Sequence, residues 1–228
     1  MKEITRFIKE GLKITSKTKV NEYNRPKSKK ELQDLLKQLI TERGNEGDFN
    51  DIDTSEITDM VDLFYDIDKF NGDISKWDVS NVVNMNSMFY KCKSFNRPLN
   101  DWDVSNVTDM NGMFYKCKSF NQDISKWDVS NVTGMHSMFY RCESFNQPLN
   151  KWDVSNVINM ENMFDGCTSF NQPLNSWDVS NVNDMECMFN GCKSFNCDIS
   201  NWDVSNVNHT SFMFENCLIE EKYKPKFK

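Results

Sequence analysis

The sequence has only two histidines among its 228 residues, and no uninterrupted run of apolar side chains is longer than three residues. So few histidines leave little material for acid–base or metal chemistry near neutral pH. A membrane-spanning helix needs about 20 consecutive apolar residues, so the short runs argue against one. Residues 1–20 carry scattered lysines and arginines but no apolar core of a secretory signal, which predicts a chain without one. The eight glycines form no phosphate-cradling loop. An ordinary enzyme is therefore the less favoured class.

Charge is divided unevenly along the chain. Residues 1–47 carry a net charge of +5 and residues 48–228 a net charge of −12, which together give −7. A basic head on an acidic body suggests two parts with different roles. Because nucleic-acid phosphates are neutralised by lysine and arginine, the acidic body argues against a nucleic-acid partner.

An internal repeat dominates the sequence. The hexapeptide Trp-Asp-Val-Ser-Asn-Val occurs six times at a spacing of 25 residues, without insertion or deletion. A degenerate seventh copy precedes them, with Ile52 at the tryptophan position. A fixed period in this range predicts a solenoid of the leucine-rich-repeat type. The six copies start at Trp77, Trp102, Trp127, Trp152, Trp177 and Trp202.

The pattern inside one unit predicts an α/β fold. Apolar residues alternate with polar ones over 99–104, which predicts a short parallel strand. Over 107–117 they recur at helical spacing, which predicts a short helix. Stacked copies place the strands about 4.8 Å apart. The buried set predicted for one unit is Phe95, Leu99, Trp102, Val104, Val107, Met110, Met113, Phe114 and Cys117.

Three regions follow from these patterns: a basic helical segment and cap over 1–47, about seven repeats over 48–217, and a short basic tail over 218–228. Residues 28–43 are expected to form the capping helix, with Ser28 and Glu31 as a capping box and Gly44 as the stop. Residues 1–14 are amphipathic. They fit a second capping helix or a docking peptide for a partner or an anionic membrane, the one membrane contact we expect.

The unit that runs from Phe145 to Cys167 resembles the repeat of BspA-like leucine-rich-repeat surface proteins. Its pattern is Phe-Asn-x-Pro-Leu-Asn-x-Trp-Asp-Val-Ser-Asn-Val-x-x-Met-x-x-Met-Phe-x-x-Cys. The resemblance implies a bacterial, often surface-displayed, non-enzymatic adhesion or interaction module. It implies a protein or glycan partner, no cofactor and no catalytic residues.

The head of the chain suggests an alternative. Met1-Lys2-Glu3, followed by Phe7-Ile8-x-Glu10, resembles the N-terminal targeting peptides of proteins packaged into tailed-phage heads. This resemblance implies a virion-associated or packaged structural protein with an N-terminal targeting helix. The missing signal sequence leaves a cell-surface, a cytoplasmic and a virion location open.

A column of aspartates is the candidate ligand-binding site. Strand alternation places them on the outward face, where three interpretations apply. The carboxylates accept bonds from backbone and serine donors in the same turn, or form a strip for a basic partner, or bind calcium, which needs six to eight oxygens around one ion. The column comprises Asp78, Asp103, Asp128, Asp153, Asp178 and Asp203.

Cysteine and histidine offer no clear metal or catalytic constellation. Six of the eight cysteines recur at the 25-residue spacing, which predicts a buried core ladder. Cys187, Cys192 and Cys197 give Cys-x4-Cys-x4-Cys, which is not a typical zinc spacing. His136 and His209 fall at different positions of the repeat, and neither has an obvious serine, cysteine or carboxylate partner. We therefore expect no metal site.

Overall fold

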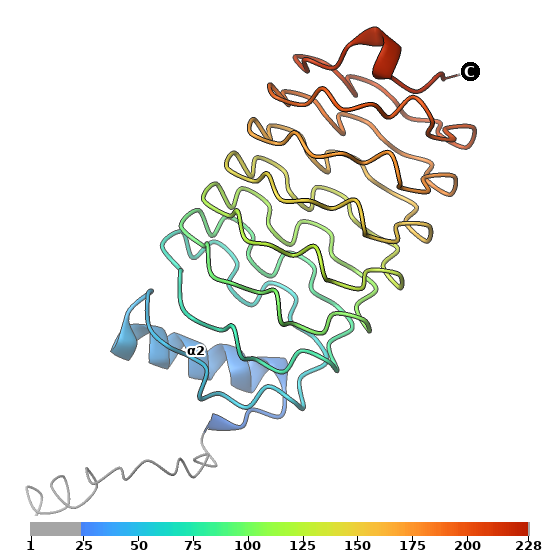
Figure 1. Cartoon of the computed structure of the whole chain (residues 1–228). Helices are drawn as coiled ribbons and strands as arrows, with labels where there is room; N and C mark the ends of the chain where they lie inside the picture. The colour runs from blue at the N-terminus through green and yellow to red at the C-terminus, as the bar shows by residue number, and fades with distance from the viewer. Residues whose placement is uncertain (1–23, 228) are drawn as a thin grey trace, which may run out of the picture.

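A computed structural model describes residues 24–227 (Figure 1), and the amphipathic segment 1–14 lies outside them. The helices of the described chain are α2 (Lys29–Arg43) and the short 3-10 helix η2 (Glu221–Tyr223). No helix in this part of the chain is long and apolar enough to cross a bilayer. Between α2 and η2 the chain winds into successive coils that lie one over the next (Figure 1).

The coils are in register with the 25-residue repeat. Parallel β-bridges join residues 25 positions apart, each to its equivalent in the next coil. A further parallel bridge joins Asp48 to Asp73. The main series runs through Asp59, Asn84, Asp109, Gly134, Asn159, Asp184 and His209.

Local conformation within a coil differs from the predicted strand and helix. Parallel pairing occurs at Asp109, not over 99–104, where the Trp102 N–H bonds back to the Leu99 carbonyl at 3.1 Å. Residues 111–116, inside the predicted helix, form a series of tight turns. Gly112 and Lys116 have φ of 60° and 59°, whereas helical residues have φ near −63°. The apolar stripe is buried as predicted, but left-handed residues break the helix that would have carried it.

Backbone bonding explains why turns replace the helix. Alternate N–H groups bond to the next coil: Met110 donates to the Gly134 carbonyl at 3.0 Å, and Phe114 to the Met138 carbonyl at 2.9 Å. The Met113 N–H between them closes a turn on the Met110 carbonyl at 3.2 Å. An N–H that donates to a carbonyl of the neighbouring coil does not donate to the carbonyl four residues earlier, as it would in an α-helix. Each coil therefore gives up internal helix bonds for bonds along the stack.

The core consists of ladders of identical side chains. Rings of Phe89 and Phe114 stack at 5.5 Å between centroids, and those of Trp102 and Trp127 at 6.5 Å. All nine residues predicted as the buried set of one unit are at most 4% exposed. Burial of repeated aromatic, methionine and cysteine side chains thus accounts for their abundance in the sequence.

Helix α2 covers the first coil. The Ser28 hydroxyl accepts from the Glu31 N–H at 3.3 Å, and Gly44 ends the helix with a φ of 76°. Leu32, Leu36 and Leu39 are buried in the same core as the coils. This helix lies across the N-terminal end of the stack, opposite the end that carries the C-terminal tail (Figure 1).

The C-terminal tail covers part of the last coil. Ile219 is 6% exposed, and the Ile199 N–H donates to the Tyr223 carbonyl at 3.0 Å. Phe212 and Leu218 stay 61% and 67% exposed. The last coil is therefore less protected than the first.

Candidate functional site

Each aspartate of the predicted column is held by the serine two residues later. Through Oδ1 the six carboxylates accept the serine N–H at 3.0–3.1 Å. At Asp78, Asp103, Asp128 and Asp153 the serine hydroxyl also donates to Oδ1, at 2.6–2.7 Å. All six side chains are exposed. These are the local donors that the structural interpretation of the column requires.

The same bonds affect acidity. Donation from the Ser105 hydroxyl and N–H lowers the pKa of Asp103, and Ser180 does the same for Asp178. A carboxylate that accepts such bonds is stabilised in its ionised form. Asp103 and Asp178 are therefore charged at neutral pH, and each carboxylate of the column is tied to the turn that it initiates. Binding of a ligand to the column stays a prediction.

The tryptophan and asparagine of the hexapeptide donate hydrogen bonds to backbone carbonyls of the preceding coil. The Trp127 Nε1–H donates to the Leu99 carbonyl at 2.9 Å, and the Asn131 amide to the Ser105 carbonyl at 2.8 Å. Both valines of the motif are buried. A further asparagine column forms an internal ladder between coils: the Asn121 N–H donates to Asn96 Oδ1 at 2.9 Å. Each repeated residue thus has a structural role.

Five of the six cysteines of the predicted core ladder are buried, and the sixth, Cys217 in the last coil, is half-buried. The Cys117 thiol donates to the Phe89 carbonyl at 2.9 Å, and Cys142 repeats this contact with Phe114. Burial raises the pKa of Cys117 and Cys142 well above the ordinary value, so both are protonated at neutral pH. Cys187 and Cys197 are half-buried. Within residues 24–227, no group of three or more histidine, cysteine or acidic side chains is placed to hold a metal ion.

Both histidines have carboxylate neighbours that the sequence did not reveal. His136 Nδ1 lies 3.2 Å from Glu161 Oε2, and its Nε2 lies 3.3 Å from Ser137 Oγ. His209 Nδ1 lies 3.3 Å from Asp184 Oδ2. The prediction that neither histidine has such a partner was wrong, because a 25-residue step brings residues of adjacent coils together.

The serine contact of His136 belongs to the turn geometry. Ser137 is only 5% exposed. The side-chain pair at the same two positions recurs elsewhere, as Ser87 with Asn86 at 2.8 Å and Asn162 with Glu161 at 2.8 Å.

A second exposed column lies on the edge formed by the turns. Tyr65, Tyr90, Tyr115 and Tyr140 stack in order, with ring centroids 4.4, 4.4 and 4.5 Å apart and planes within 9° of parallel. Tyr65 is 47% exposed, and the other three are half-buried. Desolvation and the neighbouring phenol raise the pKa of Tyr65, Tyr90 and Tyr115, so these three phenols are neutral at physiological pH.

Cations follow the tyrosines along this edge. Lys91 Nζ lies 5.2 Å from the Tyr90 centroid, Lys116 Nζ 5.1 Å from that of Tyr115, and Arg141 Cζ 5.3 Å from that of Tyr140. These distances are typical of cation–π contacts. We call this surface the tyrosine–cation edge, and it comprises Tyr65, Tyr90, Tyr115, Tyr140, Lys91, Lys116 and Arg141.

Sequence reasoning missed the tyrosine–cation edge. The signal was present as an aromatic and basic pair at one position of the repeat in three consecutive copies, Tyr90-Lys91, Tyr115-Lys116 and Tyr140-Arg141. The next coil has Asp165 and Gly166 at these positions.

Beyond Arg141 the edge becomes hollow, and the row of cations is interrupted by Gly166. A cavity of about 310 Å³ is lined by residues that include Arg141, Asp165, Gly166 and Gly191. Burial raises the pKa of Asp165. The edge therefore has two parts of different charge and shape.

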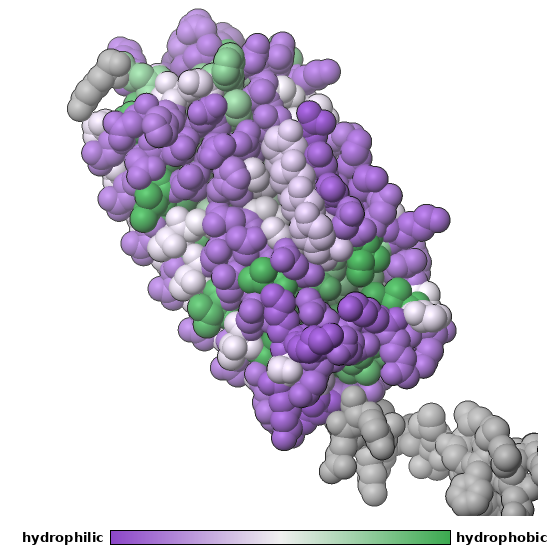
Figure 2. All heavy atoms as spheres, turned by 180° about the vertical axis from the view of Figure 1, so that it is seen from behind, coloured by the Kyte–Doolittle hydropathy of each residue, from purple (hydrophilic) through white to green (hydrophobic). Residues whose placement is uncertain are grey.

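Figure 2 shows the molecule from the side opposite to that of Figure 1. Hydrophilic side chains cover most of this face, and apolar side chains appear on it as separate small groups.

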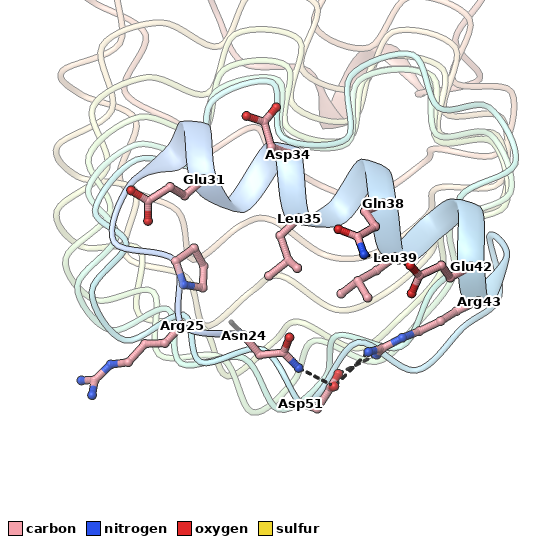
Figure 3. Close-up of a pocket in the computed structure, with 11 residues that line it drawn as sticks. Asn24, Arg25, Glu31, Asp34, Leu35, Gln38, Leu39, Glu42, Arg43 and Asp51 are labelled. Atoms are coloured by element: carbon pink, nitrogen blue, oxygen red, sulfur yellow. Dashed lines mark hydrogen bonds and ion pairs between the residues drawn. The ribbon is translucent and has the colours of Figure 1, made fainter. Parts of the chain in front are cut away.

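A larger cavity, of about 660 Å³, lies between α2 and the segment that precedes it (Figure 3). Leu35 and Leu39 point into it from the helix (Figure 3). At its rim Arg43 donates to both carboxylate oxygens of Asp51, at 2.6 and 2.9 Å, and the Asn24 amide donates to the same carboxylate at 2.8 Å. Arg43 lowers the pKa of Asp51. These contacts fix the helix to the first coil.

A model of the family described as "Mycoplasma protein of unknown function, DUF285" matches residues 32–148 and again residues 122–224. The chain belongs to this family. Two overlapping matches agree with a chain built from repeats. Neither a curated protein nor a solved structure matches the chain. The assignment of this chain to the leucine-rich-repeat class of solenoids therefore stays a prediction.

Proposed function

We propose that the protein is a non-enzymatic interaction or adhesion solenoid of the leucine-rich-repeat type, related to BspA-like surface proteins. It binds a protein or glycan partner through its repeat surface. One observation carries this proposal: the repeated residues are used inside the stack, whereas the exposed turn edge changes part-way along it. Tyr140 and Arg141 give way to Asp165 and Gly166 in the next coil, although the core around them is unchanged.

Variation at exposed positions on a constant scaffold is what a binding solenoid needs. Stacked repeats create an extended surface, and partners are distinguished by the side chains displayed on it. A stack with a purely structural role would not need this variation, because one side chain that suits the turn could be repeated in every coil. The virion-associated alternative rests on residues 1–14, which lie outside the described residues.

A binding array tests this proposal. The full chain is applied to purified glycans and purified extracellular proteins, beside a variant in which Tyr90, Tyr115, Lys116 and Arg141 are replaced by serine. We expect a ligand with a dissociation constant of about 10 µM or tighter for the parent chain, weakened at least about tenfold in the variant. Absence of any ligand, or equal binding by both chains, would contradict binding through the turn edge.

A further inference from the structure

We propose that the tyrosine–cation edge binds an acidic polysaccharide laid along the stack, with one anionic group for each of Lys91, Lys116 and Arg141. This inference rests on the proposed function, and it names the partner's chemistry and the part of the surface that it contacts. Three observations carry it: the straight row of cations, their position in an otherwise acidic body, and the spacing of the coils.

Lys116 and Arg141 are available to a ligand, whereas a ligand that contacts Lys91 must compete with a carboxylate of the chain. Lys91 lies 3.7 Å from Asp66 Oδ1, but among the described residues neither Lys116 nor Arg141 forms an ion pair. Their contacts with tyrosine rings hold the charged groups in place without neutralising them. Lysine and arginine held in this way suit carboxylate and sulfate groups, and arginine can bind such groups through two parallel hydrogen bonds.

The surrounding charge makes this edge selective. Residues 48–228 carry a net charge of −12, so a polyanion is repelled by most of the molecule. Asp66 stands at the same repeat position as Lys91, one coil before it, and Asp165 follows Tyr140 in its column. The row of cations is therefore bounded by a carboxylate at each end, which limits the ligand to a short stretch across these coils.

Coil spacing favours a polysaccharide over an extended peptide. The tyrosine rings step by 4.4–4.5 Å from coil to coil, and one cation accompanies each ring after the first. An extended peptide repeats side chains on one face only every second residue, about 6.6 Å apart, which is out of step with the coils. An acidic polysaccharide carries an anionic group and hydroxyls on successive sugars. Its hydroxyls can bond to the phenol groups, which present their edges because each ring face between Tyr65 and Tyr140 is covered by its neighbour.

The test measures binding of polygalacturonate to the full chain by isothermal titration calorimetry, with neutral dextran as the comparison polymer. We expect polygalacturonate to bind and dextran not to bind. Raising the salt from about 50 to about 300 mM should weaken polygalacturonate binding several-fold, because exposed charges are screened.

Matched double variants locate the site. Lys116→Gln with Arg141→Gln removes two charges from the edge, and Lys126→Gln with Lys151→Gln removes two from exposed positions beside the aspartate column. The edge pair should bind polygalacturonate about tenfold more weakly or worse, and the control pair within about twofold of the parent chain. Thermal unfolding of both pairs shows whether each variant remains folded. Tyr115→Phe, which keeps the stacked ring and removes the hydroxyl, should weaken binding by a smaller factor.

Three outcomes would overturn the inference: no binding of polygalacturonate, equal loss in the two double variants, or tighter binding of poly-L-glutamate than of polygalacturonate. If polygalacturonate fails while the array yields another ligand that depends on the turn edge, the proposed function stands and this inference falls.

Discussion

Two exposed columns run along the same coils, the aspartates that follow each tryptophan and the tyrosines of the turn edge. The aspartate is present in all six copies of the hexapeptide, whereas the tyrosine position holds tyrosine in four coils and then Asp165, Asn190 and Glu215. Both columns are reachable by solvent, so exposure alone does not explain the difference.

Hydrogen bonding explains why the aspartate is constant and the tyrosine is not. Asp128 accepts two bonds from Ser130, at 3.1 and 2.7 Å, and the turn before the next part of the coil depends on them. The Tyr115 side chain contacts the equivalent residues of its neighbours through its stacked ring and its phenol group, and its removal leaves no backbone group unsatisfied. Repetition therefore marks residues that the coil itself needs, and variation marks residues that it can exchange. This distinction leads to four predictions.

The largest effect is expected in the core ladder. Trp127→Ala should lower the free energy of unfolding by about 3–5 kcal/mol, because it leaves a cavity and removes one of the two hydrogen bonds that the Leu99 carbonyl accepts. Tyr115→Ala on the edge should cost about 1 kcal/mol, mainly from lost ring stacking. Urea unfolding of the two variants checks both values. Similar costs at the two positions would contradict the division into scaffold and exchangeable edge.

Within the aspartate column, Asp128→Ala should cost about 1 kcal/mol because the Ser130 donors lose their acceptor. Asp128→Asn keeps an accepting oxygen and should cost less. If both substitutions instead raised stability, relief of repulsion between neighbouring carboxylates would outweigh the local bonds. The aspartate column would then be favoured over the tyrosine–cation edge as the ligand-binding site.

Burial and the capping helix could be predicted from the sequence, because they depend on periodicity and on local capping residues, whereas the turns depend on contacts between coils. Burial of Trp102, Val107 and Met110 follows from periodicity, because any stack with this repeat must cover those side chains. The helix 28–43 follows from local capping by Ser28 and Gly44. The turns over 111–116 could not be foreseen, because helical spacing of apolar residues does not show that alternate N–H groups bond to another coil.

The site was predictable in part for a related reason. Asp103 was identified from strand alternation, and its serine partner was among the interpretations offered. The partners of His136 and His209 lie one coil away, so they become neighbours only when the stack is assembled with its 25-residue step.

Acid should affect the two exposed columns in opposite directions. Hydrogen bonds from Ser105 hold the pKa of Asp103 below its unfolded value, so this stability is present at neutral pH and is lost as the pH falls through the folded pKa. Burial holds the pKa of Asp165 above its unfolded value, so its contribution is present at low pH and is lost as the pH rises. Asp103→Asn should lower the urea midpoint at pH 7 more than at pH 3, and Asp165→Asn should raise it at pH 7. A midpoint that moves the same way in both variants at pH 7 would show that their surroundings do not differ as described.

The smallest effect should come from left-handed backbone on the turn edge. Phe212 has φ of 56° and is 61% exposed, so its side chain contributes little packing while its Cβ is strained. Three other coils place glycine at one of the two left-handed positions, at Gly112, Gly166 and Gly191. Phe212→Gly should therefore raise the free energy of unfolding by about 0.5–1 kcal/mol. Phe212→Ala serves as the control, because it removes the same exposed ring but keeps the strained Cβ. A gain in the alanine variant equal to that in the glycine variant would assign the effect to the exposed ring and not to the backbone.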